Sequence, residues 1–248
     1  MRFGVVTLFP EALMALVETG VIGRAIGDGK VVVNTESPRS HAHDKHRTVD
    51  DRPFGGGPGM VMTPQPTVDA INALRESIPG AKVVYLTPQG KVFDQAKAVE
   101  FSRCESMILL CGRYEGIDER IIESVVDEEV SLGDFVLSGG EVAAAAIIDA
   151  VSRLVPGVLG HPESAEQDSF ANEGWLDCPH YTRPENYNGM AVPPVLMSGD
   201  HKAIALWRRQ QALTRTRMRR PELINESALT DADKKLLKNV ESDNPDSQ

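Results

Sequence analysis

The segment LGDFVLSGGE, residues 132–141, combines an apolar core with a turn that holds three glycines and two acids. A strand-like run, DEEVS, precedes it, and an alanine-rich run that is typical of a helix, EVAAAAIIDAVS, follows it. Strand, loop and helix in this order form the repeating unit of an α/β sheet, whose ligands bind at the carboxyl ends of the strands. The segment therefore predicts an α/β fold with a binding loop at residues 132–141.

The same alternation runs through the first 160 residues. Strand-like runs FGVVTLF, KVVVNTE, KVVYLT and SMILLCG alternate with helix-like runs such as PEALMALVETG and IDERIIESVV, which predicts a mostly parallel sheet covered by helices. A stretch rich in Gly, Pro, Asn and Ser follows, and then two more helix-like runs. We expect an α/β domain at 1–160, a linker at 161–175 and a small helical domain at 176–248.

The composition is that of an ordinary soluble globular protein, with 41% hydrophobic and 25% charged residues. Its longest apolar run, residues 142–150, is too short to span a membrane, and the amino-terminal residues do not resemble a secretion signal. The three cysteines, odd in number and widely spaced, match neither a disulfide framework nor a metal motif. We therefore expect a cytoplasmic protein with no membrane partner.

Positive charge is concentrated in one stretch of an otherwise acidic chain. Residues 202–220 contain seven Lys and Arg residues and no acid, a local charge of +7. Because the whole chain carries a formal charge of −10, the remainder carries −17. This asymmetry favours a polyanionic partner for residues 202–220, although a solvated helix face paired with acids elsewhere would have the same composition.

Three successive strand-like runs end in glycine-bearing loops, YLTPQGK, CGRYEGID and LGDFVLSGGE. If these strands are neighbours, the three loops line one pocket, where glycines let the backbone approach a flat ligand closely. The chain has no G-x-x-x-x-G-K-[ST] phosphate loop, and GGGPGM at residues 55–60 fails the G-x-G-x-x-G pattern of dinucleotide-binding proteins. A nucleoside without phosphates is the ligand that best suits these loops.

These motifs, together with DCPHYTRPE, KHRTVDDRPFGGGPGMVM, VPPVLMSGDH and RTRMRRPELI, resemble the bacterial tRNA (guanine-N1)-methyltransferases of the SPOUT superfamily. The resemblance covers nearly the whole chain. It implies a SPOUT-type parallel sheet with a deep trefoil knot and a small all-α carboxyl-terminal domain. It also implies a homodimer whose active site crosses the interface, S-adenosylmethionine as methyl donor, a need for Mg²⁺, and tRNA rather than DNA as partner. The reaction implied is methylation of N1 of guanosine 37, beside the anticodon.

The resemblance also implies the residues that hold the cofactor. They come from the three loops: Tyr85, Leu86, Pro88, Gly112, Tyr114, Glu115, Leu132, Gly133, Asp134, Phe135, Val136, Leu137, Gly139 and Gly140. Phe135 stands where the family often has tyrosine, so a hydroxyl contact is lost there while adenosine binding should survive.

Guanine N1 carries a proton that must be removed before it can attack a methyl group. By resemblance, Asp168 is the general base, and Arg153 is the cation that stabilises charge developing at O6 or orients the substrate. Taken alone, Asp168 would be an ordinary solvated loop acid. The residues expected to handle the tRNA are Asp177, His180, Arg183, Lys202, Arg208, Arg215 and Arg217; the ligands of a metal ion stay open.

Other functions remain to be separated from this one. A related SPOUT enzyme could act on ribosomal RNA or on a ribose 2′-hydroxyl, which has no N1 proton to remove. A non-catalytic RNA-binding module would leave Asp168 and Arg153 without a role. A Rossmann methyltransferase is disfavoured because its glycine fingerprint is absent.

Overall fold

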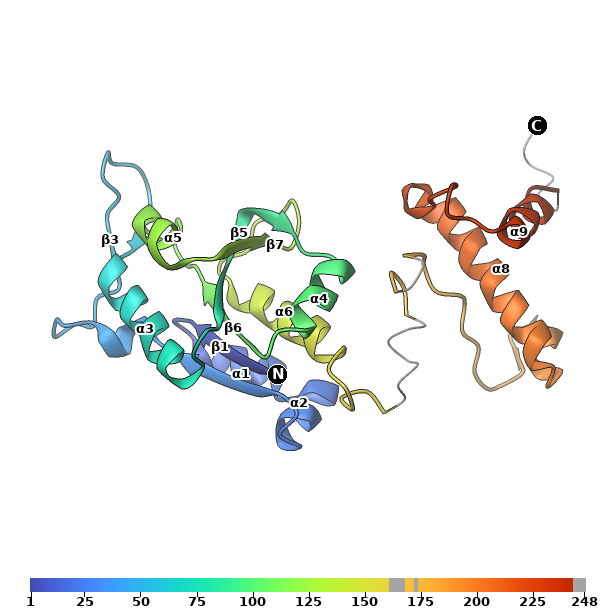
Figure 1. The fold of residues 1–248 in the computed structure, drawn as a ribbon, viewed down its shortest axis with the longest axis horizontal. Helices are drawn as coiled ribbons and strands as arrows, with labels where there is room; N and C mark the ends of the chain where they lie inside the picture. The colour runs from blue at the N-terminus through green and yellow to red at the C-terminus, as the bar shows by residue number, and fades with distance from the viewer. Residues whose placement is uncertain (161–167, 172–173, 243–248) are drawn as a thin grey trace. The chain divides into compact units, whose positions relative to one another are not determined.

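The polypeptide divides into two units, Met1–Pro162 and Glu163–Gln248, in the computed structural model. The structure describes residues 1–160, 168–171 and 174–242 (Figure 1). Of the linker expected at 161–175, residues 161–167 and 172–173 therefore lie outside the described residues. Within the described ranges, no helix has the length and apolar character needed to cross a membrane.

A five-stranded parallel sheet forms the centre of the first unit. Its order is β2-β1-β6-β5-β7, and every neighbouring pair is parallel, which confirms the predicted α/β fold with a parallel sheet. Strands β5, β6 and β7 run in one direction, so their carboxyl ends lie at the same edge of the sheet. The loops predicted after β6 and β7 therefore begin at that edge. The strands are β1 (Arg2–Val6), β2 (Val32–Glu36), β5 (Lys82–Val92), β6 (Ser106–Cys111) and β7 (Glu128–Ser131).

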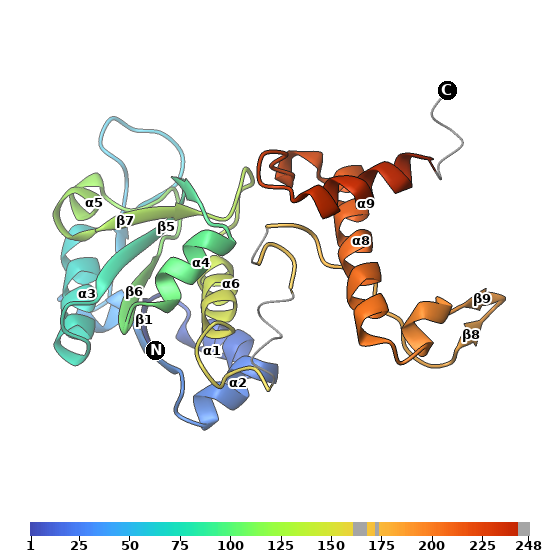
Figure 2. The same cartoon turned by 45° about the vertical axis from the view of Figure 1, so that its right-hand side comes forward.

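Helices cover both faces of this sheet (Figures 1 and 2). Successive side chains of a strand point to opposite faces, so Val5 and Leu109 enter one core cluster while Val6 and Leu110 enter the other. The helices on the first face are α1 (Pro10–Val17), α2 (Gly20–Gly27), α4 (Gln95–Ser102) and α6 (Glu141–Ser152), and those on the second are α3 (Pro64–Ser77) and α5 (Glu119–Val125).

The expected loop YLTPQGK is in fact a bulge inside β5. Leu86 and Lys91 both pair with Val130 of β7, so residues 87–90 loop out of the sheet and pairing then resumes. Gly90 permits this, because a Cβ there would lie 2.3 Å from the backbone nitrogen of Val130. The bulge turns residues 87–90 away from the ladder at the edge where the loops after β6 and β7 begin.

A second segment, residues 49–63, packs beside the β6 loop. It contains the short antiparallel pair β3 (Asp50–Asp51) and β4 (Val61–Met62), which follows a 3₁₀ turn, η1 (Pro38–His41). The backbone nitrogen of Glu115 donates to Met60 O at 2.9 Å, and that of Met62 donates to Gly116 O at 3.0 Å. The glycine-rich loop between β3 and β4 is thus tied to the loop that carries Glu115.

The second unit is mainly helical. Its elements are η2 (Pro194–Met197), α8 (His201–Arg219), η3 (Pro221–Leu223) and α9 (Asp231–Ser242), with Leu213, Ile224 and Leu229 in its core. Asp200 caps α8, accepting from the backbone nitrogens of Lys202 and Ala203.

The expectation of an all-α domain needs a correction, because two short strands, β8 (Asn186–Tyr187) and β9 (Met190–Ala191), form a hairpin in this unit. Asn188 and Gly189 connect them with φ values of 52° and 83°, as a two-residue turn with positive φ at both positions requires. The Asn-Gly pair was the sequence signal for this turn.

Candidate cofactor cleft and substrate-binding residues

A cleft of about 330 Å³ lies in the first unit at the carboxyl ends of β6 and β7 and beside the bulge of β5. The three predicted loops meet there. Of the predicted cofactor residues, all except Tyr114 and Asp134 line the cleft. The lining also contains residues that were not predicted: Thr87, Gln89, Arg113, Gly116, Ile117, Glu119, Ile122, Val130, Ser131 and Ala143.

Glycines let the chain close around this cleft. A Cβ at Gly112 would lie 2.9 Å from the Tyr85 hydroxyl, and one at Gly140 would lie 2.7 Å from Cys111 Cα, so neither position has room for a side chain. Gly140 N also donates to Gly112 O at 3.0 Å. The end of the 132–140 loop is thereby held against β6. Burial raises the pKa of Tyr85, so its phenol stays neutral beside the cleft.

Tyr114 and Glu115 occupy a strained turn. Tyr114 has a φ of 60°, which is uncommon for a residue with a side chain. Burial raises the pKa of its phenol, and so does a hydrogen bond to Asp50. Glu115 is exposed, lines the cleft, and packs so closely on Gly59 that a Cβ there would lie 2.3 Å from Glu115 Oε1. The turn thus places the Glu115 carboxylate at the cleft. Through the contact with Gly59, the turn also packs against the 50–60 loop.

Arg113 is a lining residue that the sequence analysis missed. Its guanidinium lies 2.8 Å from the buried Glu141 carboxylate at the start of α6 and 4.4 Å from the centre of the Phe9 ring. Its Nη1 donates to the carbonyl of Ser138 at 3.2 Å. On the other side of the carboxylate, the Thr7 hydroxyl donates to Glu141 Oε1 at 2.7 Å. One buried carboxylate thus connects the end of β1, the end of β6 and the loop that lines the cleft.

The two predicted catalytic residues belong to different units. Arg153 is the partly buried C-cap residue of α6 in the first unit, and Asp168 is exposed at the start of the described part of the second. Both make interactions with neighbouring groups. Their catalytic roles stay predictions.

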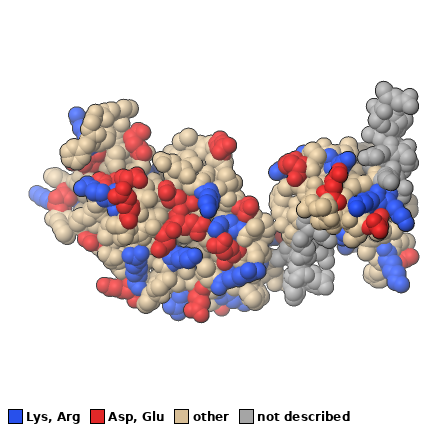
Figure 3. All heavy atoms as spheres, turned by 45° about the horizontal axis from the view of Figure 1, so that its top comes forward, with Lys and Arg blue, Asp and Glu red and all other residues tan. Residues whose placement is uncertain are grey.

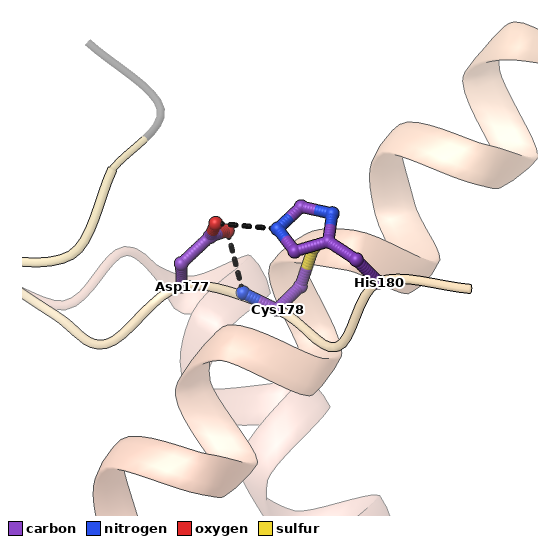
Figure 4. A group of neighbouring side chains, drawn as sticks. All are labelled: Asp177, Cys178 and His180. Atoms are coloured by element: carbon purple, nitrogen blue, oxygen red, sulfur yellow. Dashed lines mark hydrogen bonds and ion pairs between the residues drawn. The ribbon is translucent and has the colours of Figure 1, made fainter. Parts of the chain in front are cut away.

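Asp177 and His180 are hydrogen-bonded to each other on the second unit. Figure 4 shows the two side chains pointing toward each other, with Asp177 Oδ2 2.8 Å from His180 Nε2. Asp177 also accepts from the Cys178 backbone nitrogen at 2.6 Å. Burial raises the pKa of Asp177, but the hydrogen bonds from His180 and Cys178 outweigh it and the net pKa is lowered. Asp177, Cys178 and His180 are also the one group of three metal-ligating side chains that meet among the described residues.

The basic residues that are expected to bind tRNA lie on α8 and on the loop before the β8–β9 hairpin. Lys202, Arg208 and Arg217 are exposed, and Arg215 is partly buried. Arg183 is exposed on the loop before the β8–β9 hairpin. Some basic residues of α8 have acidic partners, as expected for a solvated helix face paired with acids elsewhere in the chain. Arg217 pairs with Glu226 at 2.9 Å, and Arg209 pairs with Asp233 at 2.6 Å. On the face drawn in Figure 3, acidic and basic side chains are interspersed over the first unit.

The fold and the cleft together define an α/β protein with a glycine-lined cleft at the carboxyl ends of its parallel strands. Residues 1–226 match the family described as tRNA (Guanine-1)-methyltransferase TrmD, and the chain belongs to this family.

Relatives named tRNA (guanine-N(1)-)-methyltransferase match almost the whole chain. The one from Pseudoalteromonas atlantica is 59% identical over 95% of this chain and 89% of its own length. The one from Pasteurella multocida is 57% identical over 98% of this chain and 99% of its own length. The one from Shewanella denitrificans is 58% identical over 96% of each.

Proposed function

We propose that this protein transfers a methyl group from S-adenosylmethionine to N1 of guanosine 37 in tRNA. The observation that carries the proposal is membership of the tRNA (Guanine-1)-methyltransferase TrmD family across residues 1–226. The cleft agrees with it in chemistry, because its glycine-rich walls suit a flat nucleoside. The site of action is the cytoplasm, where tRNA is processed.

The cleft residues would hold the methyl donor. Backbone groups of residues 132–140 and of Gly112 would contact the adenosine, and Glu115 would face the polar end of the cofactor. S-adenosylmethionine supplies an electrophilic methyl group on a sulfonium. In the structure, the end of the loop after β7 returns to Gly112, the residue after β6, through a hydrogen bond from Gly140 N to Gly112 O. The trefoil knot implied by the resemblance is part of the proposal because the chain belongs to the family.

In the proposed mechanism, Asp168 removes the proton from guanine N1. A carboxylate within hydrogen-bond reach of N1 can take this proton as methyl transfer proceeds. Arg153 would stabilise the negative charge that develops at O6. Asp177 and His180 would help to orient the splayed-out nucleotide, as single-stranded loop bases are read on their Watson–Crick edges.

Phosphate contacts would come from Arg183 and from the basic residues of α8. Such contacts supply affinity that falls with added salt and carry no sequence information of their own. The negative charge of the rest of the chain would discourage non-specific RNA binding.

Mg²⁺ is also part of the proposal. Magnesium keeps several waters and binds through one or two carboxylates, so an exposed cleft carboxylate such as Glu115 fits its chemistry. Methyl transfer should therefore fall on chelation and return with added Mg²⁺.

We further propose a homodimer with the active site across its interface. Support comes from apolar side chains that are exposed on the first unit: Phe9, Leu16 of α1, Val136 of the cleft loop, and Val142 of α6. An interface between two copies of the chain would cover these side chains. Sedimentation of the purified protein should give twice the chain mass.

The proposed function is tested by product analysis. The protein is incubated with methyl-labelled S-adenosylmethionine, Mg²⁺ and tRNA transcripts bearing G or A at position 37, and the digested nucleosides are identified by mass spectrometry. We expect N1-methylguanosine from the G transcript alone. A methylated ribose, label in both transcripts, or donor binding without transfer would each reject the proposal.

A further inference from the structure

The segment that carries Asp168 folds back on itself within the second unit. Phe170 N donates to Trp175 O at 2.7 Å, and Asp177 N donates to the Ser169 hydroxyl at 3.0 Å. Asp168 O itself accepts from Ala171 N at 3.2 Å. The backbone immediately after Asp168 is therefore bonded to residues 175–177, and the placement of Asp168 depends on what holds those residues.

One support for residues 175–177 is a buried hydroxyl of α8. Leu176 N donates to Thr216 Oγ1 at 3.0 Å, and the same hydroxyl donates to Ala212 O at 2.7 Å. Thr216 is fully buried, although it lies between two arginines in the sequence. Its hydroxyl proton thus goes to the helix, and its oxygen remains to accept from the loop.

A second support is Trp175. Its side chain packs against the core formed by Leu213, Ile224 and Leu229. The guanidinium of Arg209 lies over its ring, 4.9 Å from the ring centre, and adds a cation–π contact. Asp233 holds that guanidinium through contacts to Nε at 2.6 Å and to Nη2 at 3.1 Å. Trp175 is thereby fixed by both α8 and α9.

We propose that Thr216 and Trp175 are positioning residues, which hold the Asp168 segment on α8 in the arrangement that proton removal requires. The inference rests on the proposed function, in which Asp168 is the base. Thr216 lies between Arg215 and Arg217, two of the residues proposed to contact tRNA phosphates. In this proposal, α8 both contacts the RNA and supports the segment that carries Asp168. Binding of tRNA and placement of the catalytic carboxylate would therefore depend on the same helix.

The first test replaces the hydroxyl of Thr216. Thr216→Val keeps the shape of the side chain but leaves Leu176 N without its acceptor, whereas Thr216→Ser keeps the hydroxyl. Thr214→Val is the matched control, because Thr214 lies on the same helix and makes the same intrahelical bond, to Gln210 O at 2.8 Å. Each variant is compared with wild type in single-turnover methyl transfer, in tRNA affinity and in S-adenosylmethionine affinity.

We expect Thr216→Val to lower the single-turnover rate by roughly ten- to a hundredfold, the scale of a misplacement of about 1 Å. The affinities for tRNA and donor should change by less than about twofold, and Thr216→Ser and Thr214→Val should transfer at nearly the wild-type rate. A general loss of structure would lower tRNA affinity as well, so the separation of rate from affinity identifies a positioning role.

A second pair of variants keeps the proposal testable if Thr216→Val does not fold. Trp175→Phe retains a ring for Arg209 and should transfer faster than Trp175→Leu, with equal tRNA affinity in both. Asp168→Asn is measured in parallel. If Thr216→Val and Trp175→Leu transfer at the wild-type rate while Asp168→Asn is inactive, the positioning roles are overturned and the role of Asp168 as the base still stands. An active Asp168→Asn would instead reject Asp168 as the base.

Discussion

The buried charge pair of Arg113 and Glu141 joins three parts of the first unit at a single carboxylate. Glu141 is only 4% exposed, so removing its charge leaves the Arg113 guanidinium without a counter-ion beneath the cleft. The same guanidinium holds the Ser138 carbonyl and packs so tightly on Gly139 that a Cβ there would lie 2.2 Å from Arg113 Nε. The pair therefore fixes the cleft loop as well as the fold.

Glu141→Gln tests this pair. The variant keeps an acceptor for Thr7 but loses the charge that faces Arg113, so we expect the free energy of unfolding to fall by about 3 kcal/mol. Donor affinity should fall too, because the 132–140 loop loses its anchor. Urea unfolding and calorimetric titration with S-adenosylmethionine measure the two effects. Glu123→Gln, an exposed residue of α5, is the control; equal results for both variants would contradict the anchoring role.

Single residues of the cleft were predictable to different degrees. The glycines and apolar residues of the three loops could be named because loop glycines signal close backbone approach and the motifs resemble a known family. Arg113 was missed because its role depends on Glu141 and Phe9, which lie far from it in the sequence and meet it only in the fold. A long-range ion pair leaves no local pattern.

At the scale of elements, the five strands and the longer helices follow from hydrophobic periodicity. Helix α2 was missed, since its sequence GVIGRAIG holds three glycines, which disfavour a helix, whereas the burial of Ile22 and Ala25 in the core stabilises it. The bulge in β5 was taken for a loop because its Pro and Gly are typical of turns, while pairing with β7 resumes beyond them. In both cases tertiary packing overrides local preference.

The start of α9 combines a helix cap with a contact to α8. The Asp233 backbone nitrogen donates to the Thr230 hydroxyl at 3.2 Å, and the Thr230 backbone nitrogen donates to the Asp233 carboxylate at 3.0 Å, which forms a T-x-x-D cap. Asp233 also receives both contacts from Arg209 of α8. The hydrogen bond from the Arg209 guanidinium lowers the pKa of Asp233 from 3.8 to about 2.

This pKa shift predicts a pH dependence of stability. The folded-state pKa lies below the unfolded one, so the contribution is complete above about pH 4 and is lost as the pH falls through 2. We expect Asp233→Asn to cost on the order of 1–2 kcal/mol at pH 7, since Arg209 is partly exposed. In urea unfolding between pH 7 and 2, the difference from wild type should shrink with acidity. The control is Asp231→Asn, an exposed acid in the same turn; a constant difference would contradict the assignment.

For the whole molecule, the uneven distribution of charge bears on RNA binding. The chain carries −10 overall, yet residues 202–220 carry +7. An acidic chain with one strongly basic segment favours a partner that docks in a defined orientation, because that segment attracts phosphates most strongly.

Arg215→Ala tests the RNA surface. If Arg215 contacts one phosphate, its removal should weaken tRNA binding and reduce the slope of log affinity against log salt by about 0.7–0.9. Donor affinity should stay unchanged. Arg24→Ala, which removes an exposed arginine from α2 of the first unit, changes the net charge equally and serves as control. An unchanged slope across a salt series, measured by filter binding, would remove Arg215 from the interface.

The central claim, that Asp168 removes the N1 proton during methyl transfer from S-adenosylmethionine, is tested most directly by single-turnover kinetics of Asp168→Asn on tRNA with G at position 37. The account predicts a rate at least about 10²-fold below wild type, the contribution of a general base, with donor and tRNA affinities near wild type. A rate within about threefold of wild type at the same affinities would contradict it.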